Sequence, residues 1–357
     1  MEHRRNTTKI SDCLKKYNMN QRIEYIDAMR GLAILLVVIC HCCHLSFQNT
    51  IVYSIEINQA IQIPLFFLIS GFFASQLTRK SFWDCIYDKI THLIIPALLM
   101  LGTYCWIFGL SFQKTILTGF KNGYWFTFVL FGFIVLYYLI SLVLTTRKLK
   151  LKQSSIESSH IIIAVIISYV GLATTNLENK SPLFGLFSTK EYFNYTYFVL
   201  GSILFNHRSS LFRLLQNKYL SGSIILIAIT ARIVNAIYGT EVLKYFCGIF
   251  SLAVHLIMII IIWMLFHKYQ TLCYNTKTGH FLSLIGRRSL DVYFLHYFFL
   301  PDLHIWGEYF LSIKAPLIEY LCSVALSIPV IFASLGIGYI LRLSSLTTKL
   351  FLGAKYT

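Results

Sequence analysis

Ten apolar runs, most of them about 20 residues long, punctuate this chain of 357 residues. A helix needs about 20 apolar residues to cross the hydrocarbon core of a bilayer. The runs lie at residues 28–47, 57–78, 91–110, 124–145, 159–177, 192–207, 219–238, 245–266, 281–300 and 317–341. They predict an all-α, polytopic membrane protein with about ten transmembrane helices.

The supply of charge excludes a soluble fold of ordinary type. Only 13% of the residues are charged, and 56% are hydrophobic, whereas soluble domains carry about 25% charged residues. In water such a chain would leave large apolar areas exposed, and a lipid bilayer removes that problem. The lipid bilayer is therefore the expected partner of most of the surface.

The basic residues lie between the apolar runs and alternate in number along the chain. With residue 1 in the cytoplasm and ten crossings, 23 of the 31 Lys and Arg residues lie in inner segments and 6 in outer loops. Arg30 and Arg232 lie within apolar runs. The positive-inside rule therefore predicts ten helices with the N and C termini cytoplasmic, in a multi-pass protein of the cell membrane.

The net charge of +16 is then a feature of topology, and we expect no nucleic-acid partner, since no basic groove is visible. The organisation that follows is a cytoplasmic basic tail over residues 1–25, one membrane domain over 26–345 and a short cytoplasmic tail over 346–357.

The first apolar run carries a polar face. Arg30 and His41 are eleven residues apart, which on an α-helix leaves them within about 20° of one another and about 16 Å apart along the axis. Asp27, three residues before Arg30, is placed to pair with it. Gly31 would allow another helix, or a ligand, to approach closely. Together these positions predict a polar cavity that reaches inward from the cytoplasm.

The residue types on this face suit chemistry. A neutral histidine can act as a general base, and an arginine can bind phosphate in bidentate fashion. Two plainer interpretations stay open: Arg30 snorkels to the interface while His41 makes one interhelical hydrogen bond, or the segment from Cys40 to His44 binds zinc. The metal interpretation is disfavoured because Cys40, Cys42 and Cys43 point in different directions on a helix.

Four segments in order resemble the acyltransferase-3 family of membrane acyltransferases. They are D-x-x-R-G-L-A with R-x10-H in residues 25–41, IPLFFLISGFF in 63–73, YWF in 124–126 and GRRSLDVYFLH in 286–296. The resemblance covers about residues 22–345, nearly the whole chain. The family's core of ten helices agrees with the number of apolar runs.

The resemblance implies transfer of an acyl group, commonly acetyl from acetyl-CoA, to a hydroxyl of a carbohydrate. His41 would be the base or the acyl carrier, and Arg30, supported by Asp27, would hold the phosphates of the donor or steady the surroundings of His41. Acyl-CoA would be the donor substrate, and no tightly bound cofactor is expected. The acceptor would be a surface polysaccharide or its lipid-linked precursor.

One segment departs from the family pattern. Many members carry R-x-x-R shortly before a proline at the start of the third helix, and here Lys89 and His92 stand before Pro96. Lys89 keeps a charge but loses the guanidinium fork, so a donor-phosphate contact at this point is expected to be weaker.

Three further residues are secondary site candidates. Ser70, beside Gly71, marks a point of close approach or of ordinary helix packing. Trp125 would stack on a sugar ring or anchor the chain at the outer interface. His296 is an intramembrane histidine near the outer side, and Asp291, about 140° around the same helix, would not share its face.

A second class of function is a transporter or flippase for glycans. Transporters commonly show internal repeats and paired broken helices, and the sequence indicates neither. A third reading is an inactive relative of the family, motivated by Lys89 and His92.

Overall fold

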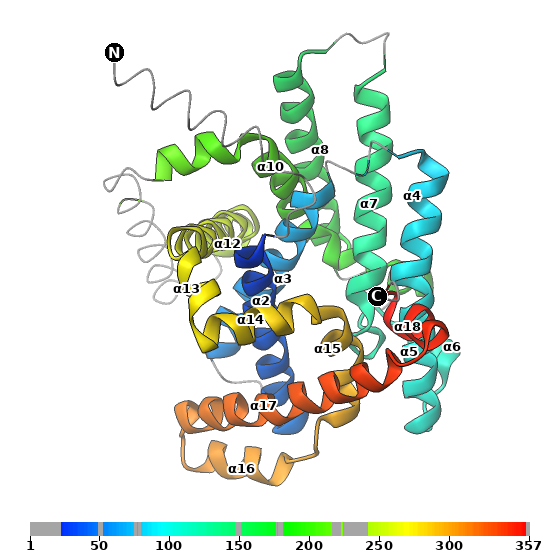
Figure 1. Cartoon of the computed structure of the whole chain (residues 1–357), viewed down its shortest axis with the longest axis vertical. Helices are drawn as coiled ribbons and strands as arrows, with labels where there is room; N and C mark the ends of the chain where they lie inside the picture. Colours follow the sequence, from blue (N-terminus) through cyan, green and yellow to red (C-terminus); the bar gives the residue numbers. More distant parts are fainter. Residues whose placement is uncertain are drawn as a thin grey trace.

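The computed structural model describes residues 23–48, 53–74, 77, 80–146, 151–175, 177, 181–215, 223 and 242–354. Within these residues the fold contains helices and no strands (Figure 1). The all-α prediction is confirmed for the described part of the chain.

The helices of the first half, in chain order, are α2 (Glu24–His41), η1 (Cys42–Ser46), α3 (Tyr53–Ala74), α4 (Phe82–Lys89), η3 (Ile90–Ile94), α5 (Ile95–Ile107), α6 (Phe112–Ile116), η4 (Lys121–Gly123), α7 (Trp125–Leu144) and α8 (Gln153–Ala173). Those of the second half are α9 (Pro182–Phe187), η5 (Thr189–Asn194), α10 (Tyr195–Leu215), α12 (Val242–Lys268), α13 (Gln270–Asn275), α14 (Lys277–Arg287), α15 (Ser289–Leu295), η6 (His296–Phe299), α16 (His304–Ser312), α17 (Pro316–Leu341) and α18 (Ser345–Leu352).

Five helical segments are long and apolar enough to cross a membrane: Glu24–Ser46, Phe82–Ile107, Trp125–Leu144, Gln153–Ala173 and Pro316–Leu341. Two shorter apolar helices, Asn58–Ala74 and His255–Lys268, accompany them. The predicted run at 219–238, with Arg232, lies outside the described residues except for residue 223. The membrane class therefore holds, while the number of ten crossings and the side of the termini stay predictions.

The tryptophans at the two ends of the Phe82–Ile107 segment indicate how it meets the membrane. Trp83 is 75% exposed and Trp106 is 83% exposed, and about 34 Å of helix separates them. Tryptophan gathers at both membrane–water interfaces, and that spacing is close to the thickness of the bilayer core. The segment therefore has the length and the exposed aromatic ends that are typical of a membrane span.

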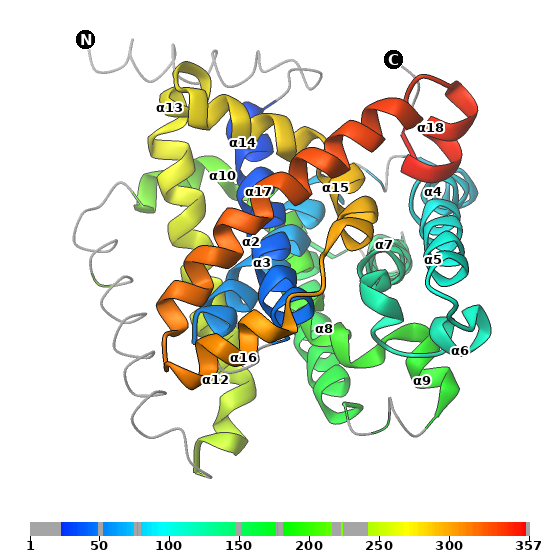
Figure 2. The same cartoon turned by 90° about the horizontal axis from the view of Figure 1, so that it is seen from below.

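The first membrane helix, α2, lies in the interior of the bundle, with α14 and α17 packed across it (Figures 1 and 2). In its apolar window 72% of the residues are buried, against 22% for α8. Gly31 explains the close approach of α14, because a Cβ there would lie 1.9 Å from the carbonyl oxygen of Leu282. A second glycine, Gly286, meets α2 in the same way, 1.8 Å from the carbonyl oxygen of Asp27. A helix, not a ligand, uses the space at Gly31.

The predicted span at 281–300 is wrong as a single helix. Helix α14 ends at Arg287, α15 starts at Ser289, and a 3-10 turn follows from His296. A buried ion pair accounts for the interruption. Asp291 is 2% exposed and accepts two hydrogen bonds from Arg342 at the end of α17, with Nη2–Oδ1 at 2.7 Å and Nε–Oδ2 at 2.9 Å. A buried carboxylate needs such a partner, and the bend between α14 and α15 brings it to one.

Two helices change from α to π geometry along their length, in η1 directly after His41 and in η3 around His92. A π turn widens the helix and re-aims the side chains beside it, and such turns are frequent at functional sites. The first of them places the end of α2 against η6 and α17.

Candidate functional site

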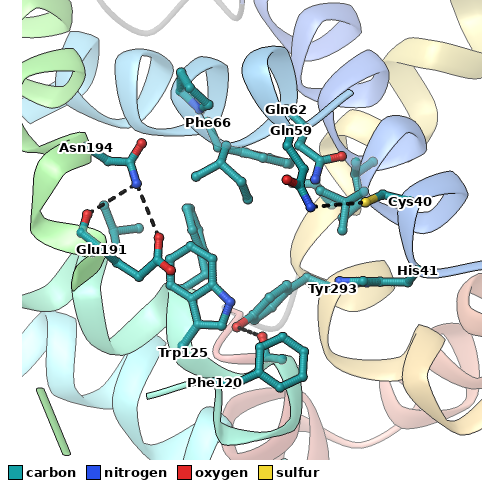
Figure 3. Close-up of a pocket in the computed structure, with 18 of the residues that line it drawn as sticks. Cys40, His41, Gln59, Gln62, Phe66, Phe120, Trp125, Glu191, Asn194 and Tyr293 are labelled. Carbon is teal, nitrogen blue, oxygen red and sulfur yellow. Dashed lines mark hydrogen bonds between the residues drawn. The ribbon is translucent and has the colours of Figure 1, made fainter. Parts of the chain in front are cut away.

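An interior cavity of about 960 Å³ opens between α2, α3, α7, η5 and α15 (Figure 3). Its size is at the upper end of the range for small-molecule sites, about 300–1,000 Å³. Arg30 and His41 both line it, and so do Ile34 and Val37 between them. The four positions form one stripe of α2, as the eleven-residue spacing predicts.

Arg30 occupies one end of this stripe. Its Nη1 lies 3.8 Å from Oδ1 of Asp27, the pairing that the i, i+3 spacing predicts. The guanidinium carbon also lies 5.0 Å from the centre of the Phe73 ring. Asp27 is buried while Arg30 is about one-third exposed, so the ion pair keeps the guanidinium at the cavity wall and does not draw it into the protein.

His41 lies in a chain of three hydrogen-bonding side chains. Its Nδ1 is 2.8 Å from Nε2 of His296, and its Nε2 is 3.3 Å from the hydroxyl of Tyr297. The two imidazole rings are nearly parallel, at an angle of 6°. The chain ends at the carbonyl oxygen of Val292, 2.8 Å from Nδ1 of His296.

This chain assigns the protons. The Val292 carbonyl can only accept, so Nδ1 of His296 donates to it and carries a proton. In neutral His296 the other nitrogen, Nε2, is then an acceptor, and Nδ1 of His41 donates to it. Nε2 of His41 is left with a lone pair beside the cavity, where the Tyr297 hydroxyl donates. His296 thus sets the tautomer of His41.

Hydrogen bonds from two tyrosines fix the backbone around the histidine pair. The Tyr124 hydroxyl donates to the carbonyl oxygen of Phe294 at 2.9 Å, and the Tyr293 hydroxyl donates to that of Gly123 at 3.0 Å. Gly123 has a φ of +90°, and a Cβ there would lie 1.8 Å from the Tyr297 hydroxyl. Only glycine leaves Tyr297 room to reach His41.

The secondary candidates separate into two groups. Ser70 and Trp125 line the cavity, whereas Gly71 packs against the carbonyl oxygen of Phe198 in α10. Lys89 and His92 do not line it. Both instead contact Asp88, Lys89 through an ion pair of 3.2 Å and His92 through Nδ1 donating to the Asp88 carbonyl oxygen at 2.6 Å.

The cysteines next to His41 are divided among different neighbours. Cys42 packs in an apolar cluster, and Cys43 donates to Ser323 Oγ at 3.1 Å. Cys40 lines the cavity and accepts from Gln59 Nε2 at 3.9 Å. Within the described residues no three His, Cys, Asp or Glu side chains converge as metal ligands do.

Sequence reasoning missed Tyr297, Gln59 and Glu191. Tyr297 follows His296 directly in a segment already marked as functional, so that neighbour was the available signal. Gln59 and Glu191 carry no such signal, because only the packing of α3 and η5 against the cavity brings them there.

An arginine, a histidine and a tyrosine thus line an interior cavity of this multi-helix membrane protein. The chain belongs to the acyltransferase-3 family, whose model, described as an acyltransferase domain, matches residues 23–336. It is a membrane acyltransferase. No curated protein and no solved structure matches the chain.

Proposed function

We propose that this acyltransferase moves an acetyl group from acetyl-CoA to a hydroxyl of a surface polysaccharide or of its lipid-linked precursor. The observation that carries the proposal is the lone pair of His41 Nε2 at the cavity, set by the chain from Val292 through His296. A base in a cavity, next to a hydroxyl that already donates to it, is what acyl transfer to an alcohol requires.

The reaction needs one proton to move twice. The acceptor hydroxyl takes the place of Tyr297 at His41 Nε2 and gives up its proton as its oxygen attacks the thioester carbonyl carbon. The tetrahedral oxyanion then collapses, the C–S bond breaks, and His41 returns the proton to the sulfur of CoA. The products are an ester of the acceptor and free CoA.

Tyr297 has a second part in this scheme. Once the acceptor displaces it from His41, its hydroxyl proton is free to hydrogen-bond the oxyanion. The absence of a side chain at Gly123 leaves room for the Tyr297 hydroxyl beside His41. In this scheme the hydroxyl is therefore already in position to donate a hydrogen bond when negative charge develops.

Arg30 supports entry of the donor from the opposite end of the cavity. About 16 Å of helix separates Arg30 from His41. In acyl-CoA the extended pantetheine arm likewise separates the phosphates from the thioester, so phosphates at Arg30 would leave the thioester near His41. A guanidinium binds phosphate oxygens through two parallel hydrogen bonds. Lys89 and His92 do not line this cavity, so Arg30 is the residue that would contact the phosphates of the donor.

The test is His41→Ala in membranes supplied with radiolabelled acetyl-CoA and the cell's own glycan. We expect a loss of about 10²- to 10⁴-fold in transfer, with His304→Ala, an exposed histidine, as the control. Full transfer by a folded His41→Ala protein would reject the proposal. Label that is bound to the wild-type protein and absent from His41→Ala would instead identify His41 as an acyl carrier.

The transporter alternative gains one observation, the broken segment 281–300, since broken helices line transport sites. The same membranes separate the two functions. Glycan that crosses without gaining label would support transport, and neither event would support an inactive relative.

A further inference from the structure

The cavity has two chemically different ends. Helices α2 and α3 run antiparallel, because Cys40 meets Gln59 while Arg30 meets Phe73. Gln59 therefore lies level with the His41 region, and Ser70, eleven residues on, lies level with Arg30. The end of the cavity with Gln59 is the one farther from Arg30, so the phosphates of the donor would not occupy it.

A second polar group, across the space from Gln59 (Figure 3), is balanced in charge. Glu191 Oε1 lies 3.9 Å from Lys190 Nζ, and Asn194 Nδ2 donates to the Glu191 carbonyl oxygen at 3.2 Å and to its Oε2 at 3.4 Å. Gln59 is exposed to the cavity. A carboxylate that faces a cavity accepts hydrogen bonds from hydroxyls, and an amide both donates and accepts them. The lysine beside the carboxylate offsets its negative charge, so the pair does not select a cation.

Aromatic rings line the cavity beside Glu191 (Figure 3). Trp125 lines the cavity with Phe120 and Phe126, and Figure 3 shows the Trp125 indole on the opposite side of the space from Gln59. The ring is partly exposed there. An indole face pairs with apolar C–H surface, and its N–H still reaches a polar partner. An aromatic face with hydrogen-bonding side chains on two sides matches a sugar ring, which has C–H faces and a hydroxyl rim.

A buried lysine joins the chain segments that carry Trp125 and Glu191. Lys121 is 0% exposed, and its Nζ donates to the carbonyl oxygens of Thr118 at 2.9 Å and Gly185 at 2.7 Å and to Ser188 Oγ at 2.8 Å. All three ammonium protons are thereby used. Because Trp125 follows Lys121 by four residues and Glu191 follows Ser188 by three, this contact fixes the spacing of Trp125 and Glu191 before any ligand arrives.

We infer that the space between Gln59, Trp125 and Glu191 is a subsite for a neutral sugar residue, stacked on Trp125 and hydrogen-bonded by Gln59 from one side and Glu191 from the other. The inference rests on the proposed function, since it places the acceptor beside His41, and it adds the class of sugar and the residues that select it. An acidic sugar is disfavoured, because its carboxylate would have to leave water for a site in which Lys190 is already paired with Glu191.

The experiment measures binding without any acyl donor. Saturation-transfer NMR on the protein in lipid nanodiscs is run with methyl glycosides of neutral hexoses and with a methyl glucuronide as the acidic probe. We expect transfer to the neutral glycosides and weaker transfer to the glucuronide. Trp125→Ala should weaken neutral binding about tenfold, whereas Trp106→Ala, on the lipid-facing surface, should leave it unchanged.

His41→Ala separates this inference from the proposed function. The variant should still bind the neutral glycosides while it fails to transfer acetyl. The subsite would be overturned if both tryptophan variants keep full binding of the neutral glycosides, or if both lose it equally. A preference for the glucuronide, or no binding of any glycoside, would overturn it as well. Those results would leave a transfer defect in His41→Ala intact.

Discussion

Replacing His296 by phenylalanine tests the proton assignment most directly. The substitution keeps an aromatic ring of similar size at a residue that is 0% exposed and removes the acceptor 2.8 Å from His41 Nδ1. Nδ1 then loses its partner, which costs about 1–3 kcal/mol for a buried donor. His41 can recover this only by moving its proton to Nε2 or by turning its ring, and either change removes the base from the cavity.

The size of the effect follows from that penalty. A difference of about 1–3 kcal/mol corresponds to a drop of roughly 5- to 150-fold in kcat. KM for acetyl-CoA should change little, because the donor phosphates are bound about 16 Å away at Arg30.

The assay is the initial rate of acetyl transfer in proteoliposomes, with thermal unfolding of each variant measured alongside. His296→Gln, which restores an acceptor oxygen, is the matched variant and should recover part of the rate. Wild-type kcat in a folded His296→Phe protein would refute the assignment, and so would a loss confined to KM.

Three further outcomes can be measured. Tyr297→Phe should lower kcat about 10²- to 10³-fold, as loss of an oxyanion donor does, in the same assay and with unchanged unfolding temperature; equal rates would exclude the role. Asp291→Asn leaves Arg342 without its charge partner and should cost about 3–5 kcal/mol of unfolding free energy, seen as a lower unfolding temperature in detergent; an unshifted transition would show that the pair carries no stability. Gly31→Ala should destabilise the protein by about 1–3 kcal/mol, because the added Cβ would lie 1.9 Å from a backbone oxygen, whereas Gly336→Ala has open space and should be neutral.

Helix geometry predicts the stripe of α2 well, because it depends only on residues close in sequence. The angle between Arg30 and His41 and the pairing of Asp27 with Arg30 both follow from periodicity. The composition likewise predicts the helical class and the membrane environment, because both depend on apolar length alone.

The contact of His41 with His296 depends on tertiary packing and has no local signal. The two residues are 255 positions apart, and the prediction of one continuous helix over 281–300 hides the bend that brings them together. Hydropathy averages over that bend, since α14 and α15 are each apolar on one side. The position of Lys89 and His92 away from the cavity could not be predicted for the same reason. The local pattern indicates a charge but not the direction in which its side chain points.

The ion pair between α15 and α17 has a consequence for where this domain can be cut. The family match stops at residue 336, inside α17, and a protein shortened to that boundary would lose Arg342 and the whole of α18. Helix α18 packs on α5, where Leu352 is 0% exposed and a Cβ at Gly353 would lie 2.2 Å from the His92 carbonyl oxygen. A purification tag or fluorescent fusion therefore belongs after Gly353, and a domain swap with another family member has to exchange α15 and the end of α17 as one unit.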